Sequence, residues 1–408
     1  MKKGLYLPSI FKYDIINMKR INIFLAIILL FSAGCGRGRH GSESDDFITV
    51  DVTRSFPKKE LILQDFMDVE YIPLETGGEF YCQGIVRAIG KDIIIVTNSN
   101  QINDGDIFFF DRAGKGLRKI NRKGNSSEEY TNILGITLDE DNGEMFVNNS
   151  SLRKILVYDL YGNFLRSFRH KEGTTYFRIY NYDNEYLICH DIYAPHQDPE
   201  NFRNSFFIIS KQDGNIKEVE IPFRKKLSTL LVLEVEEGAF FGGPRNCLII
   251  PFQNNWILTE PSSDTVYRCL PDYSLHPFIV RTPSVQTTNP EVFLFPTVLT
   301  DSYYFMQTVK KEYDFATQRG MPTRDLMYDR NEKSIYEHVV YNDDYSDKKT
   351  FSMIRDIVNE EIAFYQTIEA DHLVEYYEIG ALKGKLKEIA SELKEEDNPV
   401  IMLIKHKK

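Results

Sequence analysis

Residues Tyr130 to Phe168 read YTNILGITLDEDNGEMFVNNSSLRKILVYDLYGNFLRSF, a run of four short apolar segments separated by turn-forming residues. Each segment is rich in β-branched and aromatic side chains, which favour strands, and clusters of Asp, Asn, Ser and Gly lie between them. The segments are Ile133 to Leu138, Glu144 to Val147, Lys154 to Tyr158 and Phe164 to Phe168. Four strands joined by such short turns are typical of one antiparallel blade of a β-propeller.

Imperfect copies of this unit lie on both sides of it. The preceding copy runs from Gly84 to Ile120, and its Asp111 lies 48 residues before Asp159, a spacing within the range of propeller blades. A third copy contains the segments Phe206 to Ser210 and Ile216 to Ile221. A fourth, looser copy contains Cys247 to Ile250, Trp256 to Thr259, Thr265 to Leu270 and His276 to Val280. A fifth runs from Phe295 through Tyr303 to Gln307 and Asp325 to Tyr328, and ends with Ile335 to Val340.

The two ends of the chain supply the remaining strands. A ring of blades must not leave free strand edges, so propeller chains build one blade from both termini. We expect a sixth blade from Leu61 to Leu74, Ala363 to Ile368, Leu373 to Tyr377 and a final strand at Val400 to Ile404. Apolar residues at helical spacing predict one helix between these pieces: Ile379, Leu382, Leu386, Ile389 and Leu393. The predicted fold of residues 47–408 is therefore all-β, a six-bladed β-propeller of four-stranded antiparallel blades with a short C-terminal helix.

Composition limits the function. A chain of 408 residues with 42% apolar side chains can bury a large core as one domain. Without residues 1–34 the chain has 44 basic and 59 acidic side chains, a net charge of −15. This argues against nucleic acid as a partner, because binding it requires a clustered basic surface.

Residues 1–34 read as a signal peptide. Met18-Lys19-Arg20 is a charged start, Ile21 to Phe31 is an apolar run too short to span a bilayer comfortably, and small residues lead into Cys35. Met18 alone begins a complete signal peptide, so it is a candidate for the true start. The small residues before Cys35 resemble the lipobox of bacterial lipoproteins, which implies lipidation of Cys35; Ser32 stands where Leu is usual. An ordinary secretory signal with an incidental cysteine is the alternative.

Residues 35–46 continue from that cysteine as a flexible tether of Gly, Arg, Ser and acidic residues. The other four cysteines are Cys82, Cys189, Cys247 and Cys269, and their wide spacing matches no metal-binding pattern. The last three lie in or beside apolar strands, where buried free thiols are common. We expect core thiols, with one disulfide as the alternative that export would permit.

Several motifs are similar to a known family. Four stretches resemble the six-bladed β-propeller lipoproteins of Bacteroides-like bacteria, which are distant relatives of NHL-repeat propellers. These stretches are Phe110-Asp111 through Gly114, Arg122-Lys123-Gly124 with Glu129-Tyr130, Ile72 to Glu75, and Asp397 to Val400. The usual linker of that family is close to Gly-x-Gly-Pro-x-Glu-Tyr, and residues 124–130 lack its second Gly and its Pro. The resemblance covers nearly the whole mature chain and implies the fold and an envelope location. It implies no agreed activity and no catalytic residue.

The sequence offers one weak candidate site. It contains no H-E-x-x-H, G-x-S-x-G or Walker motif. His190-Asp191, followed by His196 and Asp198 on a Pro-containing loop, provides two imidazoles and two carboxylates that could hold a divalent metal. A solvated polar loop is the competing interpretation, and no cofactor is predicted.

Two functions remain open from the sequence. The first is a binding or interaction scaffold, lipid-anchored in the periplasm or outer membrane and monomeric, for a glycan, peptide or envelope protein. The second is a metal-assisted hydrolase or lyase with its site in the central channel or on the loop-rich face. Long loops predict that face as the binding surface: His190 to Arg203, Pro222 to Gly238, Arg281 to Pro290, Val309 to Thr323 and Tyr341 to Thr350.

Overall fold

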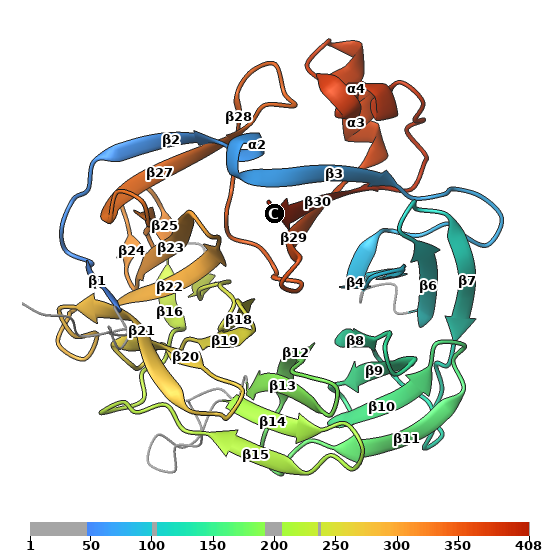
Figure 1. The fold of residues 1–408 in the computed structure, drawn as a ribbon, viewed down its shortest axis with the longest axis horizontal. Helices are drawn as coiled ribbons and strands as arrows, with labels where there is room; N and C mark the ends of the chain where they lie inside the picture. The colour runs from blue at the N-terminus through green and yellow to red at the C-terminus, as the bar shows by residue number, and fades with distance from the viewer. Residues whose placement is uncertain (1–46, 100–103, 192–205, 236–237, 408) are drawn as a thin grey trace, which may run out of the picture. The chain divides into compact units, whose positions relative to one another are not determined.

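The computed structural model describes residues 47–99, 104–191, 206–235 and 238–407. Residues Phe47–Lys408 form one compact unit, and six sheets are arranged in a ring around a central channel (Figure 1). Each core cluster that the structure describes lies within this unit, so it contains its own hydrophobic core. Among the described residues, no helix has the length and apolar character needed to span a membrane.

Blades 1 to 3 are regular four-stranded antiparallel sheets, and in each the first strand lies at the channel and the last at the outside (Figure 1). Blade 1 consists of β4 (Ile85–Ile89), β5 (Ile93–Thr97), β6 (Asp106–Asp111) and β7 (Gly116–Asn121). Blade 2 consists of β8 (Gly135–Asp139), β9 (Glu144–Asn149), β10 (Lys154–Asp159) and β11 (Phe164–Arg169). Blade 3 consists of β12 (Tyr176–Asn181), β13 (Tyr186–Asp191), β14 (Phe206–Ser210) and β15 (Ile216–Val219).

Blades 4 and 5 have the same core of four antiparallel strands. Blade 4 consists of β18 (Ile249–Phe252), β19 (Asn255–Leu258), β20 (Thr265–Cys269) and β21 (Leu275–Thr282). Blade 5 consists of β22 (Val292–Leu299), β23 (Tyr303–Lys310), β26 (Thr323–Asp329) and β27 (Ser334–Asn342), with β28 (Lys349–Phe351) paired to the end of β27. The six-bladed fold predicted from the sequence is confirmed.

Blade 6 closes the ring with strands from both ends of the chain. Its sheet has the order β29 (Ile362–Ile368), β30 (Val400–His406) and β3 (Met67–Pro73), three strands among the described residues. Both neighbours of β30 are antiparallel to it. The predicted closure by N- and C-terminal strands, including a final strand at Val400, is confirmed.

The N-terminal segment also forms two strands that sequence reasoning missed. β1 (Ile48–Asp51) pairs in parallel with β21 of blade 4, and β2 (Lys58–Ile62) pairs in parallel with β27 of blade 5. A single turn, α2 (Leu63–Phe66), then leads into β3, so the predicted strand from Leu61 to Leu74 is in fact interrupted. The first strands therefore run along the outside of three consecutive blades (Figure 1). We call residues 48–73 the N-terminal belt.

The segment between β29 and β30 differs from the prediction. Leu373 to Tyr377 is not a strand but part of α3 (Ala370–Glu378), because Ala370 and Leu373 lie one helical turn apart and are both buried. The single helix expected from Ile379 to Leu393 is instead α4 (Gly384–Ala390). The break follows from Gly380, which has φ +71°, a value that ends a helix readily.

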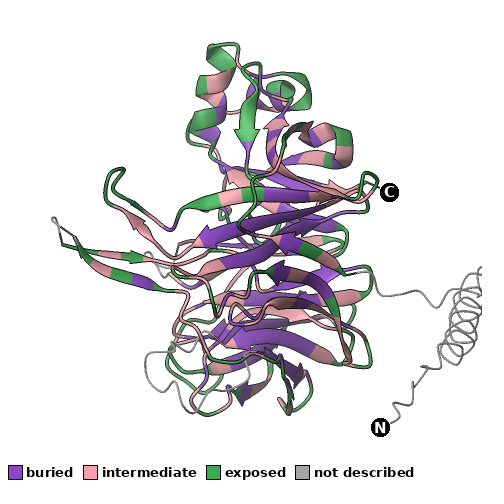
Figure 2. Cartoon of the chain, turned by 90° about the vertical axis from the view of Figure 1, so that its left-hand side faces the viewer, coloured by how far each residue is buried: buried purple, intermediate pink, exposed green. Residues whose placement is uncertain are grey.

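The core lies between neighbouring blades. One cluster joins blades 1 and 2 through residues such as Phe109 and Met145, and another joins blades 2 and 3 through Phe146 and Phe207. Apolar side chains therefore fill the space on both faces of each sheet, which explains the long apolar runs in the middle strands (Figure 2). Packing between blades leaves the inner strands to line the channel.

Candidate ligand-binding site in the central channel

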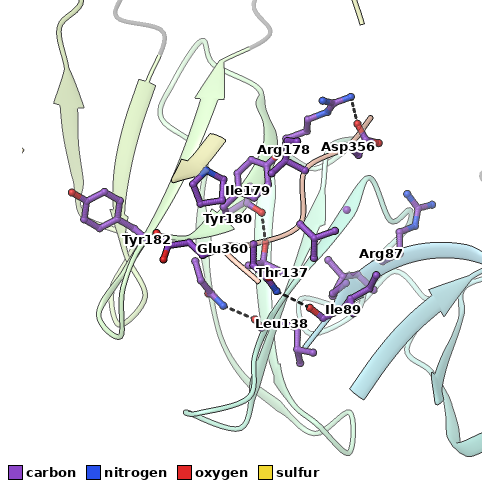
Figure 3. Close-up of a pocket in the computed structure, with 18 of the residues that line it drawn as sticks. Arg87, Ile89, Thr137, Leu138, Arg178, Ile179, Tyr180, Tyr182, Asp356 and Glu360 are labelled. Atoms are coloured by element: carbon purple, nitrogen blue, oxygen red, sulfur yellow. Dashed lines mark hydrogen bonds and ion pairs between the residues drawn. The ribbon is translucent and has the colours of Figure 1, made fainter. Parts of the chain in front are cut away.

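A cavity of about 730 Å³ lies where the inner strands converge. Its walls are β4, β8 and β12, the turn between β18 and β19, and residues 356–360, which precede β29. With Tyr365 of β29, five blades and one irregular segment therefore contribute side chains to a single space, part of which Figure 3 shows. A cavity of this size that combines apolar walls with a few polar groups is typical of sites for small ligands.

Side chains on the inner strands connect one blade to the next. The Thr137 hydroxyl donates to the Ile179 carbonyl at 2.7 Å, and the Asn181 amide donates to the Leu138 carbonyl at 2.5 Å (Figure 3). These hydrogen bonds join β8 to β12 beside the cavity. The cavity wall is therefore fixed by bonded groups.

Arg87 enters the site from a β-bulge. In the pairing of β4 with β5, Val86 faces Val96 and Ala88 faces Ile95, so Arg87 is the extra residue. Its Nε donates to the Thr97 hydroxyl at 2.8 Å and one terminal nitrogen donates to the Leu134 carbonyl of the next blade at 3.2 Å. Burial lowers the pKa of Arg87 and Tyr365 opposes this shift.

Arg178 enters from a second bulge, in β12. The pairing with β13 shifts between Phe177 and Tyr180, and Arg178 has φ +47°. This left-handed conformation costs a residue with a side chain roughly 1–2 kcal/mol. The guanidinium forms an ion pair with Asp356 at 2.5 Å and donates to the Cys247 sulfur at 2.7 Å. The chain therefore adopts a strained backbone at the point where this cation reaches the channel.

The charged groups around Arg178 influence one another. Burial alone would lower the pKa of Arg178, but Cys247 and Asp356 oppose it and the net shift is upward. Burial raises the pKa of Tyr365 to about 12, with Asp356 acting in the same direction and Arg87 and Arg178 in the opposite one. The Tyr365 hydroxyl is thus within electrostatic reach of Arg87, Arg178 and Asp356. Figure 3 shows these three charged side chains at one side of the cavity.

Aromatic rings form the wall between blades 3 and 4. Tyr182 stacks on Trp256 with a centroid separation of 5.8 Å, and Tyr180 contacts the same indole at 6.1 Å. Trp256 is the single tryptophan of the chain. Its position in the cavity wall makes it a natural reporter of binding.

Of the four residues predicted from the sequence as a ligand or metal loop, His190 and Asp191 lie in the described part of the chain. His196 and Asp198 lie outside the described residues. His190 is buried in β13 with its ring against Phe177, and burial, then Arg178 and Lys226, lower its pKa to about 3. Asp191 accepts a hydrogen bond from the Thr175 backbone. His190 is therefore a neutral core residue at neutral pH.

No metal site is formed within the described residues, where no three His, Cys, Asp or Glu side chains gather to hold an ion. Cys82, Cys189, Cys247 and Cys269 are all free thiols, and the last three are buried. The expectation of core thiols is therefore confirmed over a disulfide. Cys247 also has a polar role, since it accepts the Arg178 hydrogen bond.

The predicted loop-rich face contains two small hairpins. One is β16 (Leu231–Val235) with β17 (Gly238–Gly242), and the other is β24 (Tyr313–Asp314) with β25 (Arg319–Gly320). They pack together through Phe240 and Tyr313, whose ring centroids are 5.0 Å apart. Asp344, in the predicted loop from Tyr341 to Thr350, accepts hydrogen bonds from Tyr71 and Gln64.

A second cavity, of about 400 Å³, lies between blades 5 and 6. His338 lines it, and burial lowers the pKa of this histidine to about 4, although Asp325 opposes the shift. Arg355 also lines this cavity, and its neighbour Asp356 lines the central one. Residues 355 and 356 therefore face two different spaces.

Comparisons with known proteins agree with the fold. A family model described as a domain of unknown function, DUF4934, matches residues 47–405. The chain belongs to this family. No curated protein matches the chain. The match to DUF4934 extends over almost the whole propeller unit.

Several solved structures are similar to this DUF4934 chain. One, a Bacteroides fragilis protein described as exported, is 14% identical with a TM-score of 0.56, over 89% of this chain and 100% of that one. A Bacteroides vulgatus member of the DUF4221 family is 8% identical with a TM-score of 0.42, over 84% and 98%. Virginiamycin B lyase from Staphylococcus aureus is 12% identical with a TM-score of 0.36, over 83% and 99%. At these identities, similarity concerns the fold alone.

Sequence reasoning missed the channel residues, although each carries a visible signal. Arg87 stands within Ile85-Val86-Arg87-Ala88-Ile89, and Arg178 within Tyr176-Phe177-Arg178-Ile179-Tyr180. A cation inside an apolar strand needs a buried partner or a site, because an uncompensated charge is costly in a core. What the sequence could not show is that these strands meet at one channel.

Proposed function

We propose that this protein is a ligand-binding protein of the bacterial cell envelope, anchored by lipid on Cys35, that binds its ligand in the central channel. The observation that carries the proposal is the channel cavity, which places Arg87 and Arg178 on bulged inner strands opposite a wall of aromatic rings. Bulges and strained backbone cluster where a protein must aim a side chain.

The envelope location rests on other observations. The signal-like segment ends at Cys35, and residues 35–46 provide a spacer between that cysteine and the propeller. The Bacteroides fragilis protein of similar fold is described as exported, which fits the same location. A glycan or a peptide suits the cavity, because aromatic faces and planar polar side chains bind both kinds of ligand.

A blocked channel tests the proposal. Gly135 lies on β8 in the cavity wall, and a Cβ atom at this position would meet nothing within 4 Å. Gly135→Phe should therefore fill the cavity without a clash at the backbone. Leu165→Phe, at a half-exposed position of the outer strand β11, is the matched control.

The assay is titration of the 47–408 unit with panels of oligosaccharides and peptides while the fluorescence of Trp256 is recorded. We expect a ligand that changes the Trp256 emission in the wild type and in Leu165→Phe, and loses at least tenfold in affinity in Gly135→Phe. Equal affinity in both variants, with both folded by circular dichroism, would show that the ligand binds elsewhere.

A further inference from the structure

Two arginines line the central cavity of a protein whose net charge is negative. Arg87, Arg178 and Asp356 line this cavity, whereas Arg355, which directly precedes Asp356 in the chain, lines the second cavity. The central cavity therefore contains two guanidinium groups and the carboxylate of Asp356, which forms an ion pair with Arg178.

The other acids of the cavity are engaged with backbone groups. Asp183 accepts hydrogen bonds from the backbone of Glu185 and Tyr186 and so caps its own turn. Glu360 accepts the backbone N–H of Asn254 at 2.5 Å. These two carboxylates stabilise turns, whereas Asp356, which also lines the cavity, forms an ion pair with the Arg178 guanidinium.

Asp356 is suited to give up this contact. Its side chain is 57% exposed, whereas that of Arg178 is 22% exposed. It belongs to a stretch without helix or strand between β28 and β29. An ion pair with one exposed partner contributes little stability, so a competing carboxylate can replace it at low cost.

We propose that the channel recognises a carboxylate group of its ligand, which binds at Arg87 and competes with Asp356 for Arg178. The inference rests on the proposed function and adds the chemical class of the ligand. A guanidinium presents parallel N–H donors that match the two oxygens of a carboxylate. Asp356 then acts as the chain's own substitute for the ligand group when the channel is empty of ligand.

Two sources of such a carboxylate suit a channel in an envelope protein, an acidic sugar and the C-terminus of a peptide. Paired probes distinguish them. D-glucuronate is compared with D-glucose, and N-acetyl-alanyl-alanine with its C-terminal amide, by calorimetry and Trp256 fluorescence. In each pair the shape is similar and the carboxylate differs, so the difference in affinity measures recognition of the charge.

Three variants test the competition. Asp356→Asn removes the competing charge at nearly the same volume, and Glu360→Gln removes a charge from the same cavity without freeing a guanidinium. We expect Asp356→Asn to strengthen binding of one carboxylate probe about fivefold, which corresponds to about 1 kcal/mol. Glu360→Gln should give less than half of this gain, and Arg178→Gln should weaken the same probe.

Each outcome has a definite consequence. Three results would overturn the inference. They are equal affinity for a carboxylate probe and its neutral counterpart, an equal increase in affinity in Asp356→Asn and Glu360→Gln, and no binding of either carboxylate probe to the wild type or to Asp356→Asn. A neutral ligand that is blocked by Gly135→Phe and ignores Asp356→Asn would keep the channel as the site and exclude the carboxylate. A carboxylate that binds equally well to Gly135→Phe would instead refute the channel.

Discussion

Closure of the ring depends on β30, and this dependence can be measured. Val400, Ile401, Met402, Leu403 and Ile404 are at most 1% exposed, and the strand pairs with β29 on one side and β3 on the other. Burial of one such side chain contributes about 1.5–3 kcal/mol, so five contribute roughly 8–15 kcal/mol. This equals the whole stability of many domains. Removal of residues 400–408 should therefore leave a chain that does not fold.

A single substitution gives a graded version of the same test. Leu403→Ala should cost about 2–5 kcal/mol, because the closed ring cannot collapse around the cavity it leaves. For a unit of roughly 360 residues the unfolding entropy near the midpoint is about 0.8 kcal/mol/K, so the melting temperature should fall by roughly 3–6 °C.

Leu165→Ala, at a half-exposed position of β11, is the control and should change the stability by less than about 1 kcal/mol. Thermal and urea unfolding of the 47–408 unit, followed by circular dichroism, measure both variants. If Leu403→Ala melts with the wild type, or if the truncated chain shows the full cooperative transition, β30 does not close the ring and the reasoning is wrong.

Other predictions concern the anchor, acid stability and a buried ion pair. Cys35→Ala should abolish fatty-acid labelling and release the protein from membranes, because acyl chains contribute about 0.8 kcal/mol of membrane-binding free energy per buried methylene. Absence of the label from the wild-type protein would contradict lipidation. His190 and His338 have pKa values of about 3 and 4 in the folded state, below the unfolded value near 6.5, so the unfolded state binds more protons between these limits. The contribution of each histidine to the free energy of unfolding should be fully present above pH 6.5 and smaller by about 2 kcal/mol at pH 5. Urea titrations at the two pH values measure this difference, which should be smaller in His190→Phe than in the wild type. Lys211 and Asp139 form an ion pair at 2.5 Å, and both side chains are 6% exposed. Lys211→Ala should lower the free energy of unfolding by about 3–5 kcal/mol because it leaves the buried Asp139 carboxylate without this partner, whereas Lys211→Met combined with Asp139→Leu should recover most of the loss. Equal melting temperatures of the single and double variants would refute this prediction.

The sequence predicts the blades well because each is a local unit. The segments from Ile133 to Phe168 match β8 to β11, since alternating strands and short turns are encoded by neighbouring residues. Leu373 to Tyr377 was assigned wrongly because a short apolar run fits a strand or a buried helix equally, and contacts decided between them. β1 and β2 were missed because a parallel edge strand depends on a partner far along the chain.

The candidate site was harder to predict than the fold. His190 and Asp191 attracted attention because they are adjacent in sequence, yet His190 packs in a core. Arg87, Arg178 and Asp356 come from three distant segments, and only the closure of the ring brings them to one channel. Residue type alone could have marked the two arginines as unusual, but their shared location is a property of the tertiary structure.

The N-terminal belt sets an order on folding during synthesis. Ile48 pairs with Ile279, Lys58 with Glu337 and Met67 with His406. The strands of the belt are therefore synthesised long before the strands with which they pair. Blades 1 to 3 can form from their own residues as they emerge, while the belt stays unpaired until blades 4, 5 and 6 follow it in turn. Unpaired strands invite association with other chains. The N-terminal strands are therefore the ones that stay unpaired longest, and the synthesis of β30 ends that interval.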